Sequence, residues 1–261
     1  MRKLDLVFSK RAFLSATILV ASFSANFFNA CFAQSDVLPR WTGSTTTKVK
    51  PEMRQEFEGY LKQLIAAYKK AGTLWFLTLE TFAGDTTEYT TVVPVMNFGD
   101  LDDPPVVTKV LGEAGWERLS RRIARCYTEQ SRQYATPHTE LEIDNADVPR
   151  GMYWVETSTL VAPGKMGDYL NWLKNDYRPA LEKAGVARFQ VSQPIFGAVA
   201  GEILTMRMLK NLAEIDGGAV LSRALSDEQA RAIAAKSVVL VNSSKTRIVR
   251  MRTDLSYSAT K

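Results

Sequence analysis

The side chains best suited to chemistry are one histidine and a few charged or amide residues on predicted strands. His138 is the only histidine of the chain, and its ordinary pKa of about 6.5 makes it a candidate acid or base. Successive side chains of a strand point to opposite faces. We expect one face to hold Arg188, Gln190, Arg250, Glu156 and His138. Paired arginines bind carboxylate or phosphate groups well, so this face either binds a small anionic molecule or forms ion pairs centred on Glu156.

Other signatures of catalysis or cofactor binding are absent from the sequence. There is no G-x-S-x-G motif, no glycine-rich phosphate loop and no H-x-x-x-H motif. Two cysteines and one histidine are too few for the usual zinc cluster. The residues therefore indicate neither a metal site nor a cofactor, and they assign no catalytic residue beyond the candidate His138.

The N-terminal segment is typical of a secretory signal peptide. Basic residues precede the apolar stretch AFLSATILVASFSANFF, and small residues follow it. We predict a leader over residues 1–33, cleavage near Ala33 and a linker over 34–44. The protein would then be secreted or periplasmic. Two alternatives stay open, an uncleaved anchor and a lipoprotein acylated at Cys31.

Removal of the leader changes the charge of the chain. The full sequence has a formal net charge of +5, but the leader holds four basic residues and one acidic residue. The remainder has 29 basic and 27 acidic residues. Nucleic-acid binding needs a concentrated basic surface, so we do not expect a nucleic acid as a partner.

An internal repeat fills most of the remaining chain. VKPEMRQEFEGYLK at residues 49–62 matches VAPGKMGDYLNWLK at 161–174. The match continues through KKAG and EKAG and ends at TELEI (139–143) and TDLSY (253–257). Because the offset drifts only from 112 to 114 residues, the chain contains a duplication.

Each copy shows the same order of predicted elements, β-α-β-β-α-β. Strands rich in threonine, valine and aromatic residues alternate with amphipathic helices and short turns. This order is that of a ferredoxin-like unit. We predict an α+β protein with one unit over residues 45–146 and a second over 152–258. We expect Pro179 to kink the second long helix.

The pattern resembles the dimeric α/β-barrel superfamily, which includes NIPSNAP-like, stress-responsive and antibiotic-biosynthesis monooxygenase-like domains. The resemblance rests on V-x-P before the long helix, K-A-G after it, and N-[FL]-x-[DE]-[LI]-D after the hairpin. It implies that the two units face each other in one barrel, which would bury the sheet faces that the helices leave open.

Three classes of function follow from these expectations. The first is a protein that binds a small organic, anionic molecule in the barrel, or a non-catalytic assembly protein of the cell envelope. The second is a cofactor-free monooxygenase-like enzyme, and whether the chain is an enzyme stays open. The third, implied by haem-binding relatives, is a haem protein with His138 as the ligand. Association into a homo-oligomer stays open, and no membrane span is expected after cleavage.

Overall fold

The structure is a computed structural model that describes residues 39–148 and 150–258. The predicted leader (1–33), its cleavage near Ala33 and the lipidation alternative at Cys31 lie outside the described residues. Among the described helices, none has both the length and the apolar character needed to cross a lipid bilayer.

The first half contains four long strands and two helices. The long α2 follows a short 3-10 turn that starts at Pro51, a residue suited to a first helical turn. The elements are β1 (Trp41–Val49), α2 (Arg54–Lys70), β2 (Trp75–Ala83), β3 (Glu88–Val95), α3 (Thr108–Arg125), β4 (Tyr127–Pro137) and the short β5 (Ile143–Asp144). β1 thus begins inside the predicted linker 34–44.

The second half repeats this order. Its elements are β6 (Tyr153–Val161), α4 (Met166–Trp172), α5 (Arg178–Lys183), β7 (Arg188–Phe196), β8 (Glu202–Leu209), α6 (Asp227–Val238), β9 (Val241–Met251) and β10 (Tyr257–Ser258). A π-helical segment, Leu173–Tyr177, separates α4 from α5 just before Pro179. The helix is thus locally widened just before Pro179, which lies in the first turn of α5. The kink expected at Pro179 stays a prediction.

The eight long strands form a closed antiparallel barrel. Their order is β2-β3-β1-β4-β7-β8-β6-β9, and β9 pairs back with β2. Within each half the order is that of a ferredoxin-like sheet, and β4–β7 and β2–β9 join the two halves. The predicted fold, two fused ferredoxin-like units forming one α/β barrel, is confirmed.

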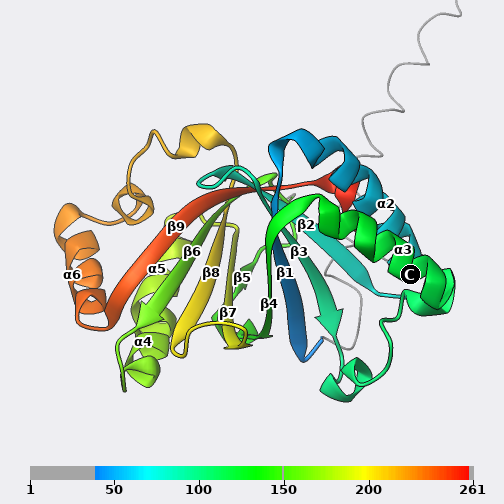
Figure 1. The fold of residues 1–261 in the computed structure, drawn as a ribbon. Coiled ribbons are helices and arrows are strands. Elements are labelled where there is room, and N and C mark those ends of the chain that lie inside the picture. Colours follow the sequence, from blue (N-terminus) through cyan, green and yellow to red (C-terminus); the bar gives the residue numbers. More distant parts are fainter. Residues whose placement is uncertain (1–38, 149, 259–261) are drawn as a thin grey trace, which may run out of the picture.

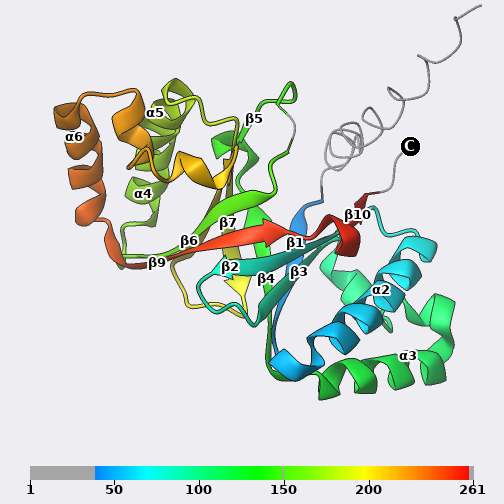
Figure 2. The same ribbon diagram turned by 90° about the horizontal axis from the view of Figure 1, so that it is seen from above.

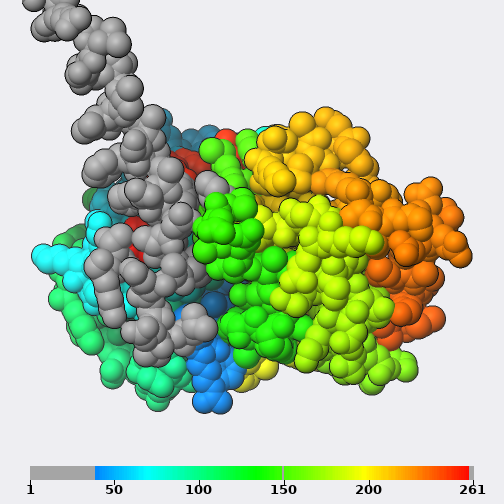
Figure 3. Space-filling view, turned by 180° about the vertical axis from the view of Figure 1, so that it is seen from behind, coloured from blue at the N-terminus to red at the C-terminus, as the bar shows by residue number. Residues whose placement is uncertain are grey.

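The helices cover the outside of the barrel on two opposite sides. Figures 1 and 2 show α2 and α3 beside the first half, and α4, α5 and α6 beside the second. In the space-filling view from behind, the bright-green part of the chain that leads from one half to the other lies between the two helical layers (Figure 3). The interior of the barrel is thus left to the inner faces of the strands and to the segments at their ends.

Equivalent hydrogen bonds recur in the two halves. Lys50 N donates to Cys126 O at 2.8 Å, and Ala162 N donates to Leu240 O at the same distance. These pairs are related by the 112- to 114-residue offset of the sequence repeat. The duplicated sequence therefore gives duplicated backbone geometry at the point where the first strand meets the second helix.

Three apolar clusters stabilise the molecule. Two lie between a sheet and its helices, and the third lies inside the barrel. The interior cluster joins Leu79 of the first half to Trp154, Val249 and Met251 of the second. Burial of these side chains inside the barrel helps to hold the halves together.

Candidate functional site

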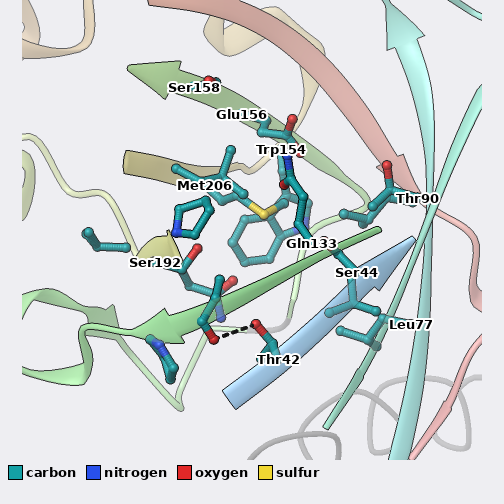
Figure 4. Close-up of a pocket in the computed structure, with 18 of the residues that line it drawn as sticks. Thr42, Ser44, Leu77, Thr90, Gln133, Trp154, Glu156, Ser158, Ser192 and Met206 are labelled. Carbon is teal, nitrogen blue, oxygen red and sulfur yellow. Dashed lines mark hydrogen bonds between the residues drawn. The ribbon is translucent and has the colours of Figure 1, made fainter. Parts of the chain in front are cut away.

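The barrel encloses a cavity of about 490 Å³. Strands of both halves supply its walls, and Figure 4 shows side chains such as Thr42, Trp154 and Ser192 converging on it. An eight-stranded barrel is wide enough to hold one small ligand. This cavity is therefore the candidate site.

Apolar and hydroxyl side chains dominate the cavity wall. Leu77, Leu79, Trp154 and Met206 are among the large apolar residues. Many of the hydroxyls come from alternate positions of strands, and Thr46 Oγ1 lies 3.1 Å from Thr90 Oγ1. The described charged residues of the wall are three acids and three bases, namely Glu142, Glu156, Glu202, Arg150, Lys245 and Arg247.

Gln190 and Glu156 lie where the sequence analysis expected them, on the cavity wall. Glu156 is 7% exposed, and its Oε1 accepts a hydrogen bond from Arg247 Nε at 2.6 Å. Arg247 Nη1 also contacts Glu88 Oε2 of the first half at 2.6 Å. Glu156 thus belongs to an ion-pair bridge between the halves, and its partner is an arginine that the sequence analysis did not select.

Arg188 lies on the barrel-facing side of β7, as Gln190 does, but it does not reach the cavity wall. It is 2% exposed. Its guanidinium pairs with Asp144, and Nη2 donates to Val148 O at 3.0 Å. Asp144 of β5 therefore supplies the negative partner of Arg188, and Val148 in the segment after β5 accepts its hydrogen bond.

The expectation that Arg250 faces the barrel is wrong. Val249 is the residue that packs in the interior cluster, together with Met251, so Arg250 points outward. There its Nη2 pairs with Glu80 Oε2 at 2.6 Å. Arg188 and Arg250 consequently lie on different sides of the sheet and form no common anion site.

His138 is also placed outside the cavity wall, contrary to the expectation. Pro137 and Thr139 line the cavity, whereas the His138 ring faces the outer side. Its Nδ1 lies 2.9 Å from Glu140 Oε1, and its Nε2 lies 3.3 Å from Gln193 Oε1. Because both ring nitrogens are engaged there, the histidine is not positioned as an acid, base or haem ligand inside the barrel.

Sequence reasoning missed Glu142 and Arg247 because it assigned the wrong face to the last strand of each repeat. A detectable signal existed for Glu142, which stands between Leu141 and Ile143. Burial raises the pKa of Glu142 to about 7, and the positive charge of Arg150 opposes this rise only in part. A cavity carboxyl with such a pKa is a typical functional group.

The described residues contain no group of three or more His, Cys, Asp or Glu side chains that could hold a metal ion. Cys126 is a fully buried free thiol at the end of α3. Burial raises the pKa of this thiol, so it is held in its neutral form against the core.

The two ferredoxin-like sheets pair along both of their edges and close into one barrel, and this closure identifies the fold. The fold is a dimeric α/β barrel in which one chain supplies both sheets. Solved structures with this barrel include a candidate monooxygenase from Lactobacillus acidophilus, with a TM-score of 0.57 and 9% identity over 84% of this chain and 95% of that one. An anthrone oxidase-like protein has a TM-score of 0.58 and 14% identity over 85% and 94%.

A candidate monooxygenase from Fusobacterium nucleatum is equally similar, with a TM-score of 0.58 and 11% identity over 87% of this chain and 97% of that one. No protein-family model matches the sequence, and no curated protein does. At these identities the likeness shows the α/β-barrel fold alone.

Proposed function

We propose that the barrel binds a small organic molecule in its central cavity. The observation that carries this proposal is the cavity of about 490 Å³ between the two sheets. Cavities of this size, with mostly apolar walls and a few polar groups, are typical of small-molecule sites. The described charged residues of the wall are equal numbers of acids and bases. The molecule is therefore expected to be largely apolar with a few hydrogen-bonding groups.

An anionic molecule stays a prediction, with different residues from those first selected. Arg188 and Arg250 pair with Asp144 and Glu80. The cations that line the cavity are Arg150, Lys245 and Arg247, and Arg247 is held between two glutamates. Measuring the affinities of a neutral probe and a carboxylate probe of the same shape would decide whether the cavity prefers an anionic molecule.

The test is a cavity-filling substitution. Ser192 lines the cavity, so Ser192→Phe should abolish binding of 2-methoxynaphthalene, an apolar probe, as measured by calorimetry. Thr246→Phe is the control, because Thr246 is exposed on another barrel strand, β9, and phenylalanine suits strands. Equal binding by the two variants, or no binding by the unchanged protein, would contradict the proposal.

The second candidate is a cofactor-free monooxygenase-like enzyme. It is favoured by the names of the three similar structures, which are called candidate monooxygenases or anthrone oxidase-like. Molecules that copurify with the protein, identified by mass spectrometry, supply the substrates to try. Oxygen consumption with such a molecule, lost in Ser192→Phe, supports an enzyme, and binding without turnover favours a binding protein. A non-catalytic envelope assembly protein is the remaining alternative, and no described contact favours it.

We further propose that the chain is exported, on the strength of the leader-like sequence of residues 1–33. The measurement is the mass of the protein isolated from its native host. An N-terminus at or near Gln34 supports export, and an added lipid on Cys31 supports the lipoprotein alternative. An intact Met1 excludes cleavage.

A further inference from the structure

Glu142 is placed so that its carboxyl faces the cavity. Its neighbours Leu141 and Ile143 both pack in the helix-facing core of the second half. Glu142 has extended backbone and directly precedes β5, so its side chain points to the opposite side from that of Ile143. Glu142 accordingly lines the cavity. Its backbone carbonyl accepts a hydrogen bond from Arg178 Nε at 3.1 Å, which fixes the backbone at this position.

The Glu142 carboxyl has no hydrogen bond or ion pair with any described residue. The other two glutamates of the cavity wall do have partners. Glu156 Oε1 accepts from Arg247 Nε at 2.6 Å, and Glu202 Oε1 accepts from Ser158 Oγ at 2.5 Å. A half-buried carboxyl without a donor loses hydration that nothing in the protein replaces. Glu142 is thus the carboxyl of the wall that is left for a ligand.

The charged groups around Glu142 do not supply a donor to it. Arg150 Nη2 lies 3.7 Å from Asp144 Oδ2, and Arg188 pairs with the same aspartate. Glu140 adds negative charge and is itself engaged with His138. The charged groups that act on the Glu142 carboxyl are Arg150, which lowers its pKa, and Glu140, which raises it.

We propose that Glu142 accepts a hydrogen bond from a hydroxyl group of the molecule bound in the barrel. The ligand class is then a neutral, largely apolar compound that carries an O–H donor. This inference rests on the proposed function and names the group that orients the ligand. The Glu142 carboxyl accepts hydrogen bonds and has no donor beside it, so the ligand group that suits it is a donor. The balanced charge of the described wall residues favours a neutral molecule.

A pH dependence follows from the titration of Glu142 near pH 7. Above its pKa the group is a carboxylate, which accepts hydrogen bonds more strongly than the neutral acid does. Affinity for a neutral hydroxyl compound should therefore rise with pH. The rise is expected to be about tenfold between about pH 6 and about pH 8, a range in which a phenol stays neutral because its pKa is about 10.

The experiment measures binding of 2-naphthol to the full chain by calorimetry across this range. Glu142→Gln keeps the size of the side chain but cannot ionise, so its affinity should stay flat and near the low-pH value of the unchanged protein. 2-Methoxynaphthalene has nearly the same shape and no donor, so its affinity should not change with pH. Glu140→Gln is the matched control, because Glu140 lies outside the cavity wall. It should keep the rise, with the midpoint moved to lower pH because the charge of Glu140 raises the pKa of Glu142.

The outcomes separate this inference from the proposed function. If neither naphthalene compound binds at any pH, both ideas are overturned. If both bind with flat profiles, or if Glu142→Gln keeps the rise for 2-naphthol, the role of Glu142 is overturned and the binding function stands.

Discussion

At the scale of single residues, two arginines of β9 and its end, Arg247 and Arg252, form ion pairs that join the two halves. Arg247 joins Glu156 of its own half to Glu88 of the other. On the outer side, Arg252 Nη1 joins Glu58 Oε1 at 2.7 Å and also contacts Glu80. Buried pairs of this kind are worth little relative to apolar substitutes, but losing one partner is costly. The arginines therefore act chiefly as links between the two halves.

We expect Arg247→Met to lower the free energy of unfolding by about 3 kcal/mol, because Glu156 would remain buried without its partner. Urea denaturation measures the change. Arg121→Met is the control, since its pair with Glu117 is exposed, and exposed pairs contribute less than about 1 kcal/mol. Adding Glu156→Gln to Arg247→Met should recover part of the loss. A loss no larger than that of Arg121→Met would show that the bridge is dispensable.

The pair of Glu58 with Arg252 should make stability depend on pH at the acid end. The hydrogen bond from Arg252 lowers the pKa of Glu58 from 4.5 to about 2. Its contribution is therefore complete above about pH 4.5 and is lost as the pH falls toward about 2. The stability difference between the unchanged protein and Glu58→Gln should shrink over this range in urea titrations. A difference that stays constant down to about pH 2 would contradict the assignment.

The surroundings of His138 explain why a lone histidine was a poor guide to the site. His138 corresponds to Arg252 in the repeat. Arg252 contacts Asp254 and Glu80, and His138 contacts Glu140 and Gln193, which are the equivalent positions. The histidine thus occupies a linking position that the other repeat fills with an arginine. We interpret its role as structural.

At the scale of elements, the pairing of β7 in one half with β4 in the other depends on close backbone packing at a glycine. Gly197 follows β7 with a φ of +78° and lies against the backbone carbonyl of Arg132, which belongs to β4 of the other half. A side chain at this position would meet both an unfavourable backbone conformation and that carbonyl. This glycine therefore permits the close approach of β7 and β4.

Gly197→Ala should lower the free energy of unfolding by about 2 kcal/mol or more, because the added Cβ forces β7 away from β4. Thermal unfolding measures the change. Gly167→Ala is the matched control, since Gly167 lies in α4 with open space around the position of a Cβ. That control should gain about 0.5 to 1 kcal/mol from the better helix propensity of alanine. Similar effects at the two positions would contradict the close approach.

At the scale of the whole molecule, each repeat completes the core of the other. Leu141 and Ile143, at the end of the first repeat, pack in the core of the second half. Leu255 and Tyr257, at the end of the second repeat, pack in the core of the first. Tyr257 Oη also donates to Thr73 O at 3.2 Å. Neither half is therefore expected to unfold by itself.

Leu255→Ala should lower the free energy of unfolding by about 2 to 5 kcal/mol, because this fully buried side chain leaves a cavity in the opposite half. The change should shift one transition, with far-UV circular dichroism and tryptophan fluorescence giving the same midpoint. Val238→Ala, at a position that is 72% exposed, should change little. Two separate transitions would show that the halves fold independently.

The sequence by itself determined the duplication, the order of the elements and the α+β class, because these depend on periodicity and on similarity along the chain. It also placed Glu156 and Gln190 on the inner face, since apolar and polar residues alternate clearly in β6 and β7. The signal peptide stays a prediction from the sequence.

Only the tertiary structure decided which face of β4 and β9 lines the cavity. The assumption that apolar residues face helices and polar residues face the barrel failed there. Val249 and Met251 fill the barrel, while Arg250 pairs outside with Glu80 of the other half. A strand pattern shows that two faces differ but not which one is buried. That choice is made by the neighbouring strand, which belongs here to a distant part of the chain.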